Sequence, residues 1–248
     1  MSSSQESTFN ISAETLEIIA VHIPKTAGTT FCNILLNIYG HEHVIEYYGS
    51  TKLAVNRINS LSDEELQNII DSRPIIKAIT GHFFADKYQQ LYPSTKTAIW
   101  LRDPIKRLIS HYYYWQTRKP TNELHKKVLD DKLSLLDFAK LPEISNFMSQ
   151  YVAGFSLEQF FFVGLQEYFE EDLKYLSRKM GWNAQYNRST KMRNSYPQYK
   201  VLVKETLADE FLMGRLKEIN SQDIQLYKRA LELRQSRPNF ELATSKSS

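Results

Sequence analysis

Two short segments of the chain combine residue types that bind anions, and each follows an apolar run. The first reads HIPKTAGTTF (residues 22–31), and the second reads WLRDPIKRLISHYY (residues 100–113). Apolar residues at helical spacing begin in both segments, so each is expected to hold a loop between a strand and a helix. Two such loops at the ends of adjacent parallel strands predict two phosphate sites, one for each end of a doubly phosphorylated nucleotide. The predicted chemistry is group transfer from such a nucleotide.

The first segment has the composition of a phosphate-binding loop. Backbone N–H groups at the start of a helix have no partner within the helix and attract an anion. Lys25 adds a positive charge, three threonines add hydroxyl donors, and Gly28 allows the backbone to approach the anion closely. The lysine precedes the glycine, unlike in the GxxxxGK[ST] loop of nucleoside triphosphatases, which argues against ordinary kinase chemistry. The alternative is a strand-to-helix turn whose lysine is only solvated.

The second segment places an arginine at the end of the predicted strand 97–101. Asp103 and Pro104 have the pattern of a helix N-cap followed by proline at the first helical position. Arg102 and Ser110 would suit a terminal phosphate monoester, which accepts forked hydrogen bonds. Ser110 lies two turns into the helix, so both residues reach one anion only if the strand end folds back over the helix. Alternatively, Arg102 pairs with Asp103 or a neighbouring carboxylate.

Together these residues resemble the sulfotransferases that use 3′-phosphoadenosine-5′-phosphosulfate (PAPS), within the carbohydrate-type branch that includes the heparan sulfate 2-O-sulfotransferases. PKTAGTT is similar to that family's 5′-phosphosulfate loop, and RDPIKRLISHYY is similar to its 3′-phosphate motif. The resemblance covers about residues 16–235. It includes Thr80-Gly81-His82, the segments NFMSQYVAG (146–154) and FFFVGLQE (160–167), and a basic stretch at 187–195.

The resemblance implies a role for each matching residue. His82 would be the general base for the acceptor hydroxyl, a role that suits a side chain whose pKa lies near neutrality, and Lys25 would stabilise charge on the bridging oxygen. Without the resemblance, a single histidine after a strand is more often structural. A sulfuryl group in transfer carries less negative charge than a phosphoryl group, so no metal is expected. The implied cofactor-binding residues are Lys25, Thr26, Ala27, Gly28, Thr29, Thr30, Arg102, Ser110, Lys191 and Arg193.

Apolar runs predict strands near residues 17–23, 43–48, 75–80, 97–101 and 160–164, with helices between most of them. This order predicts an α/β fold, a P-loop-like domain whose central sheet of about five strands is largely parallel and flanked by helices. Lys25, His82 and Arg102 would then converge beyond the carboxyl ends of the strands. A long amphipathic helix is expected from Ser221 to about Gln235.

Composition sets further limits. The 248 residues suit one domain spanning 1–248, with an ordered core at about 16–236, and the net charge of +3 is too small to predict nucleic-acid binding. Cys32 is the only cysteine, which excludes an internal disulfide. No apolar run approaches membrane-spanning length and there is no signal-peptide core. Unlike its Golgi-anchored animal relatives, the protein is therefore expected to be cytoplasmic and of bacterial type.

Two groups of side chains have no assigned chemistry. His41, His43 and His111 lack metal-ligand spacing and are expected at the surface or on helices. The four consecutive aromatic residues 112–115 point all round a helix, so at least two are expected in the core.

Alternatives remain open for the activity and for the acceptor. A P-loop kinase acting on a nucleotide or on adenylyl sulfate would share the fold, and a noncatalytic module could bind adenosine 3′,5′-bisphosphate. The acceptor hydroxyl is expected on a saccharide or glycolipid, with small alcohols also open. The sequence does not predict the oligomeric state.

Overall fold

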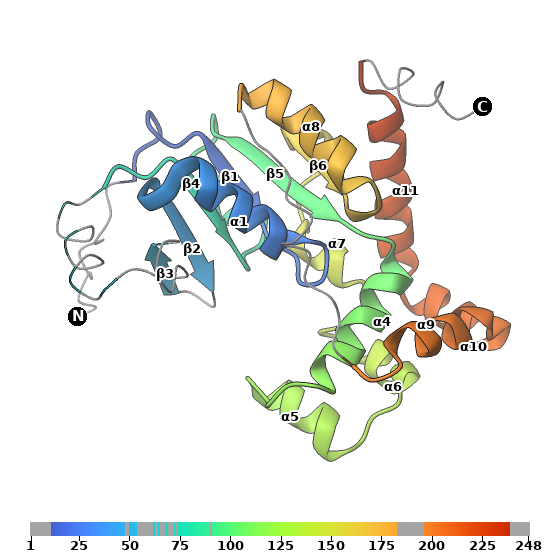
Figure 1. The fold of residues 1–248 in the computed structure, drawn as a ribbon. Coiled ribbons are helices and arrows are strands. Elements are labelled where there is room, and N and C mark those ends of the chain that lie inside the picture. The colour runs from blue at the N-terminus through green and yellow to red at the C-terminus, as the bar shows by residue number, and fades with distance from the viewer. Residues whose placement is uncertain are drawn as a thin grey trace.

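The computed structural model describes residues 11–47, 50–53, 74–89, 91–182 and 196–238, together with the single residues 62, 64, 68 and 72. Within this part of the chain, one sheet is flanked by helices (Figure 1). Its strands are β1 Ile18–Val21, β2 His43–Tyr47, β3 Ser50–Leu53, β4 Ala78–Gly81, β5 Lys96–Leu101 and β6 Phe162–Leu165. No helix in the described residues has the length and apolar composition needed to cross a membrane.

The helices fall into three groups along the chain. Those that precede β5 are α1 Gly28–Tyr39 and α3 Asp86–Gln89, with the 3₁₀ turn η1 Gly40–Glu42. Those between β5 and β6 are α4 Pro104–Trp115, α5 Glu123–Asp130, α6 Leu135–Lys140, α7 Phe147–Tyr151 and the turn η3 Leu157–Gln159. Those after β6 are the turn η4 Gln166–Tyr168, α8 Phe169–Met180, α9 Tyr199–Ala208, α10 Glu210–Ile219 and α11 Ser221–Gln235.

The strand order is β3-β2-β4-β1-β5-β6, and every neighbouring pair except β2 and β3 is parallel. The predicted α/β fold with a largely parallel sheet of about five strands is confirmed. The sheet also has a sixth strand, β3, which pairs antiparallel with β2 and was not predicted. This edge strand is only four residues long, STKL, and shows no apolar alternation that would indicate a strand.

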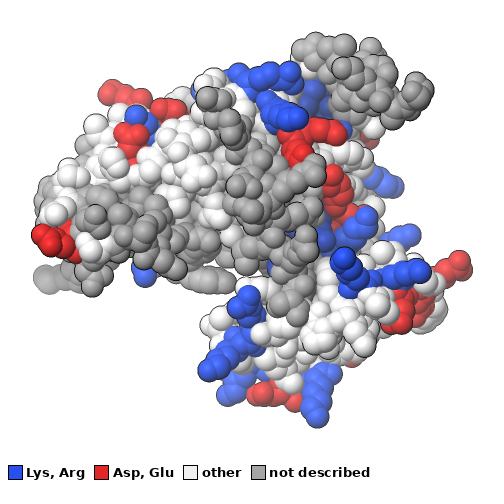
Figure 2. Space-filling model, viewed as in Figure 1, with Lys and Arg blue, Asp and Glu red and all other residues white. Residues whose placement is uncertain are grey.

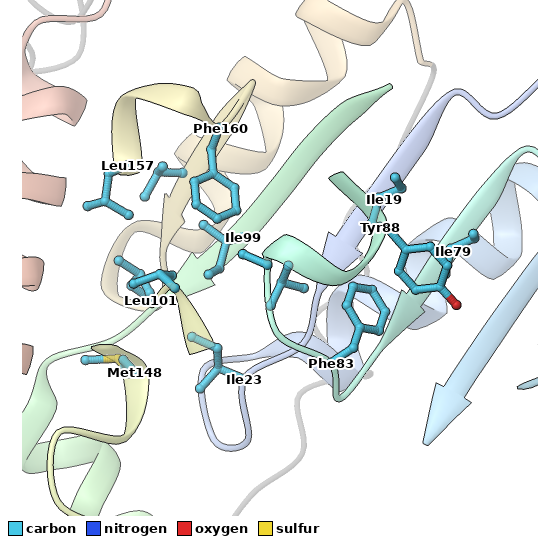
Figure 3. Close-up of a cluster of buried hydrophobic side chains, with 14 of the residues drawn as sticks. Ile19, Ile23, Ile79, Phe83, Tyr88, Ile99, Leu101, Met148, Leu157 and Phe160 are labelled. Atoms are coloured by element: carbon cyan, nitrogen blue, oxygen red, sulfur yellow. The ribbon is translucent and has the colours of Figure 1, made fainter. Parts of the chain in front are cut away.

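Alternate residues of the central strands pack on opposite faces of the sheet. Ile19 and Val21 belong to a hydrophobic cluster with residues of α7 and α11, whereas Ile18 and Ala20 belong to a cluster with residues of α1 and α8. Figure 3 shows the first cluster, in which Ile99 also takes part. Strands buried on both faces are apolar throughout, which explains the continuous apolar runs in the sequence. Packing on both faces fixes the positions of the strands. The loops that follow their carboxyl ends therefore begin at well-defined positions.

A third hydrophobic cluster joins helices that lie beyond the carboxyl edge of the sheet. Leu108 and Ile109 of α4 pack there with Val128 of α5, Phe138 of α6 and Leu216 of α10 (Figure 1). The predicted start of α4 is confirmed, because the Asp103 side chain accepts a hydrogen bond from the Lys106 N–H at 2.8 Å and proline follows. The cluster therefore fixes the α4 residues that come after Arg102.

Helices α7 and α11 cap each other. Both carboxylate oxygens of Asp223 accept backbone hydrogen bonds from the start of α7, at 3.0 Å from the Met148 N–H and 2.7 Å from the Ser149 N–H. In return, the Asn146 side-chain oxygen accepts from the N–H groups of Gln222 (3.0 Å) and Asp223 (3.2 Å). Asn146 adopts φ 49°, a left-handed conformation that asparagine tolerates. The segment 146–154 is thereby fastened to the last helix of the chain.

Candidate active site

A cavity of about 690 Å³ opens beyond the carboxyl ends of the parallel strands. Its wall includes most of the predicted site, namely Lys25, Ala27, Gly28, Thr29, Thr30, His82, Arg102 and Ser110. Of the other predicted residues, Thr26 does not line the cavity, and Lys191 and Arg193 lie outside the described residues. Loops that follow three different strands therefore meet in one place.

The loop between β1 and α1 has an unusual backbone for residues that are not glycine. Lys25 has φ 73° and Ala27 has φ 75°, both in the left-handed region. Ala27 is the N-cap residue of α1 and has no polar side chain to cap the first N–H groups of the helix. Such alternation turns successive N–H groups toward one concave side, which suits an anion. The strain is about 1 kcal/mol or more for each residue, so the surrounding structure must hold the loop in this form.

Thr26 and Gly28 shape the loop from within. Thr26 is fully buried, and its hydroxyl donates a hydrogen bond to the Ile23 carbonyl at 2.9 Å. A Cβ atom on Gly28 would lie 1.8 Å from Cδ2 of the His22 ring, so only glycine fits there. Glycine is therefore needed at position 28 because the His22 ring packs against it, whether or not an anion also approaches the loop.

His22 is the residue of this loop that sequence reasoning missed. Its ring meets the His82 ring edge to face, with 4.5 Å between the ring centroids, and it lines the cavity. The available signal was its position directly after the apolar run of β1, where side chains reach the carboxyl edge of a sheet.

His82 is held at the end of β4 by the backbone. Its N–H donates to the Glu46 carbonyl of β2 at 3.0 Å. A Cβ atom on Gly81 would lie 2.1 Å from that carbonyl oxygen, so glycine is required for β2 and β4 to approach each other here. Burial lowers the pKa of His82 from 6.5 to about 4, so the imidazole is neutral at pH 7.

Arg102 ties the two predicted anion loops together. Its Nη1 donates to the Lys25 carbonyl at 3.1 Å, and its buried Nε has no hydrogen-bond partner among the described residues. Asp103, the alternative partner for Arg102, uses its carboxylate to cap α4. Ser110 is buried and lines the same cavity, so Arg102 and Ser110 both face one site.

Lys25 is crowded by other cations. Its ammonium lies 3.8 Å from the centre of the Tyr114 ring, and the Arg118 guanidinium lies 5.1 Å from the same ring. Burial, followed by the charges of Arg102 and Arg118, lowers the pKa of Lys25 from 10.5 to about 8. Positive charge therefore exceeds negative charge on this wall, which favours an anionic ligand.

The opposite wall comes from residues after β6, which the sequence reasoning did not assign to the site. They are Gln166, Glu167, Tyr168, Phe169, Glu170, Glu171 and Lys174. Two of the carboxylates already have partners. Glu167 accepts hydrogen bonds at 3.0 Å from both the Asp103 N–H and the Tyr227 hydroxyl, and Glu171 pairs with Arg234. The signal for this wall was the predicted strand near 160–164, whose carboxyl end lies at the same edge.

Helix α8 has acidic residues in its first turn and basic residues in its last turn. Figure 2 shows this separation, with red side chains toward the cavity end of α8 and blue side chains at the far end. The arrangement complements the helix dipole, so these charges have a structural reason to be there.

A buried basic group of α4 lies outside the cavity lining. Arg107 of α4 is 0% exposed, and its Nε and Nη2 have no hydrogen-bond partner among the described residues. Its Nη1 lies 3.3 Å from Nδ1 of His111, and its guanidinium lies 4.6 Å from the centre of the Phe147 ring. Burial lowers the pKa of Arg107 from 12.5 to about 10.

Among the side chains without assigned chemistry, the expectation was wrong for His43. His43 lies on β2 and is fully buried beside Thr80, at 3.1 Å between Nε2 and the hydroxyl oxygen. His41 is exposed and His111 lies on helix α4, as expected, although His111 is buried next to Arg107.

Of the aromatic residues 112–115, Tyr112, Tyr113 and Trp115 are partly buried and pack against the third hydrophobic cluster, which agrees with the expectation that at least two belong to the core. Tyr114 instead lines the cavity, because α4 projects beyond the edge of the sheet.

Comparison with known proteins assigns the family. The model of the sulfotransferase family matches residues 8–228. The chain belongs to the sulfotransferase family. Among solved structures, mouse sulfotransferase SULT7A1 complexed with PAP is similar, with a TM-score of 0.49 and 13% identity over 93% of this chain and 91% of that chain. No curated protein sequence matches the chain. This sulfotransferase therefore moves a sulfuryl group to an acceptor.

Proposed function

We propose that this sulfotransferase takes its sulfuryl group from PAPS and transfers it to a hydroxyl on a saccharide or glycolipid. The observation that supports PAPS is the hydrogen bond from Arg102 to the Lys25 carbonyl, because it joins the 5′-side loop and the 3′-side motif in one cavity. The saccharide or glycolipid follows from the resemblance to the carbohydrate-type branch. On the same resemblance, the transfer uses no metal.

The residues of the cavity fit a nucleotide that is anionic at both ends. The volume of about 690 Å³ lies within the usual range for small-molecule sites. The start of α1 offers N–H groups and the Thr29 and Thr30 side chains, which would hold the 5′ phosphate. Arg102, whose buried Nε has no partner among the described residues, and Ser110 would hold the 3′ phosphate.

His82 is proposed as the general base. A buried, neutral imidazole can accept the proton of the acceptor hydroxyl as that oxygen attacks sulfur in line. An anion bound beside His82 favours the protonated imidazole and raises its pKa, which strengthens the base when the donor is present. Lys25, which lies just before the N-terminus of α1, would stabilise the charge that develops on the bridging oxygen.

The proposal is tested by calorimetric titration with adenosine 3′,5′-bisphosphate and with ADP, both without magnesium. One charged hydrogen-bonded contact to the 3′ phosphate contributes about 1.5–3 kcal/mol, which corresponds to roughly 10- to 150-fold tighter binding of the bisphosphate. Arg102→Gln should remove most of this preference. Arg215→Gln, which removes an exposed arginine of α10, serves as the control and should leave it unchanged.

Equal affinity for the two nucleotides would contradict the proposed 3′-phosphate site. Binding that requires magnesium would favour the kinase alternative and leave His82 without a role. Tight binding of the bisphosphate with no transfer from PAPS to any acceptor would instead favour the noncatalytic module.

A further inference from the structure

Next to His82 the structure exposes an aromatic side chain that the cavity does not use. Phe84 is 56% exposed, although its neighbours Phe83 and Ala85 are buried in the core. It follows His82 by two residues, so their Cα atoms lie within about 7 Å of each other. Single exposed apolar side chains are common, but the position of Phe84 beside a proposed catalytic base makes it a candidate contact for the second substrate.

The exposure of Phe84 is built into a well-anchored segment. The Ala85 N–H donates to the Tyr151 carbonyl at 2.8 Å, and the Lys87 N–H donates to the Phe84 carbonyl at 3.2 Å. The side chains of Lys87 and Tyr88 both bind the Glu46 carboxylate at 2.5 Å. Phe84 is thus presented to solvent by a backbone that is fixed on both sides.

Phe84 begins a row of three aromatic rings, Phe84, Tyr151 and Phe147, which we call the aromatic row. The ring centroids of Phe84 and Tyr151 are 5.5 Å apart, and those of Tyr151 and Phe147 are 5.2 Å apart. The inner end of the row rests on the Arg107 guanidinium, 4.6 Å from the Phe147 ring. The row therefore runs from solvent beside His82 into the protein.

The aromatic row and the cavity lie on different sides of His82. His82 lines the cavity, whereas no residue of the aromatic row does. Two walls of the cavity come from α1 and α8, which cover one face of the sheet, and Phe147 and Tyr151 pack on the cluster at the other face (Figure 1). If the nucleotide occupies the cavity, the aromatic row is left for the second substrate.

The cations next to the aromatic row are buried or paired, because Arg107 is 0% exposed and Lys87 pairs with Glu46. Helix α7, FMSQY, contains no acidic or basic residue, and neither does the segment Phe83–Ala85. His82 itself is neutral at pH 7 because burial lowers its pKa to about 4. An acidic sugar placed on the row would lose water from its carboxylate without meeting a cation of α7 or of this segment.

We propose that the aromatic row is the acceptor subsite and that it takes a hydroxyl carried by an uncharged ring with an apolar face. This inference rests on the proposed function and narrows its acceptor. Neutral pyranoses and phenols share this chemistry, because either ring can lie against Phe84 while its hydroxyl reaches His82. Uronic acids are disfavoured, in contrast to the acidic acceptor that heparan sulfate would provide.

The test uses a matched pair of sugars and one phenol with saturating PAPS. Methyl β-xylopyranoside and methyl β-glucopyranosiduronate present the same three ring hydroxyls and differ only by the carboxylate on C5, and 2-naphthol represents the phenols. We expect transfer to the xyloside or to naphthol at a kcat/KM at least 10-fold above that for the uronide. Which of the two neutral rings is preferred identifies the source of the ring.

Phe84→Ala should raise the KM for the preferred neutral acceptor by about 5- to 10-fold, the size expected for loss of one aromatic contact with its apolar area. Phe84→Tyr should keep the KM near the wild-type value, because the ring is retained. Phe211→Ala is the matched control, since Phe211 of α10 is 79% exposed and does not belong to the aromatic row or to the cavity. Adenosine bisphosphate affinity should stay within 2-fold in all three variants.

An unchanged KM in Phe84→Ala, or preference for the uronide, would overturn the acceptor subsite. So would a failure of every ring acceptor while the bisphosphate still binds, and that result would leave the donor site standing. Failure of the wild-type protein to bind the bisphosphate would instead contradict the proposed function itself.

Discussion

At Lys25 the fold holds a charge where charge is unfavourable. The folded pKa of about 8 lies below the usual value of 10.5, because of burial and then the charges of Arg102 and Arg118. The protonated lysine therefore opposes folding at pH 7, and this penalty disappears as pH rises from about 8 to 10.5. An anion bound beside Lys25 would offset this unfavourable free energy. The charge therefore lowers the stability of the free protein and raises its affinity for an anion.

Lys25→Met should therefore stabilise the ligand-free protein while it impairs catalysis. We expect the free energy of unfolding to rise by about 1–3 kcal/mol at pH 7, following the size of the pKa shift. Urea unfolding at pH 7 and pH 10 measures this gain, which should shrink at pH 10, where Lys25 is neutral in the folded wild type. The kcat should fall by a larger factor than the affinity for adenosine 3′,5′-bisphosphate. A gain of equal size at both pH values, or a loss of stability at pH 7, would contradict the electrostatic explanation.

His82 should change its pKa when the nucleotide site is filled. In the free protein burial holds the pKa at about 4, and a bound bisphosphate should raise it by at least about 1 unit, because a nearby anion favours the imidazolium. Histidine ring signals followed by NMR against pH measure both values, and His82→Gln assigns the signal. The same variant should reduce transfer at least about 100-fold while bisphosphate affinity changes little. A pKa that stays constant or falls would place His82 away from the anion.

At the scale of single residues, the sequence predicted Lys25, Arg102, Ser110 and His82 at the cavity because each belongs to a local motif. It did not predict that a cavity wall would need Gly28 free of a side chain for the His22 ring. Nor did it predict the burial of Arg107. Both facts depend on which side chains of other elements lie opposite, and periodicity along one element does not carry that information.

Among the elements, the mutual caps of α7 and α11 connect the end of the chain to the acceptor side of the site. Tyr151 is the last residue of α7, and its carbonyl holds the segment after His82 through the Ala85 N–H. Asp223 anchors the other end of this short helix. Five residues are too few for an independently stable helix, so α7 depends on these caps.

Asp223→Ala should cost about 2–4 kcal/mol of unfolding free energy, because one buried and one partly buried N–H group of α7 lose their acceptor. Asp209→Ala removes an exposed cap of α10 that accepts one N–H, from Leu212, and should cost only about 1 kcal/mol. Chemical denaturation of both variants provides the comparison. In activity assays Asp223→Ala should raise the acceptor KM more than the Kd for bisphosphate. Equal losses of stability would show that the α7 cap is no more than an ordinary surface cap.

Elements with strong local signals were predictable, and the one formed mainly by pairing was not. The α4 start at Asp103-Pro104 and the helix Ser221–Gln235 carry cap and periodicity signals, and both are confirmed. The edge strand β3 forms because β2 offers it a free edge, with Val44 opposite Leu53, and its own four residues give little indication of a strand. The wall after β6 was missed for a different reason, since its residues lie in a turn and at the start of α8.

For the whole molecule, the sheet order explains why residues far apart in sequence share one cavity. β1 lies between β4 and β5, so the loops that carry Lys25, His82 and Arg102 leave three adjacent strands at the same edge. That convergence follows from parallel topology and was predictable once the strands were assigned. Each face of the sheet has its own hydrophobic cluster. The helices α1 and α8 of the cavity pack on one face, and Phe147 and Tyr151 of the aromatic row pack on the other.

This separation has a consequence for the order of events in a catalytic cycle. With the nucleotide entering on the α1 and α8 side and the acceptor on the α7 side, neither has to pass the other to reach or leave His82. Addition should be random, and transfer should take place in one ternary complex without a sulfated enzyme form. Adenosine bisphosphate would then compete with the donor alone, so accumulated product would slow the enzyme even when acceptor is abundant.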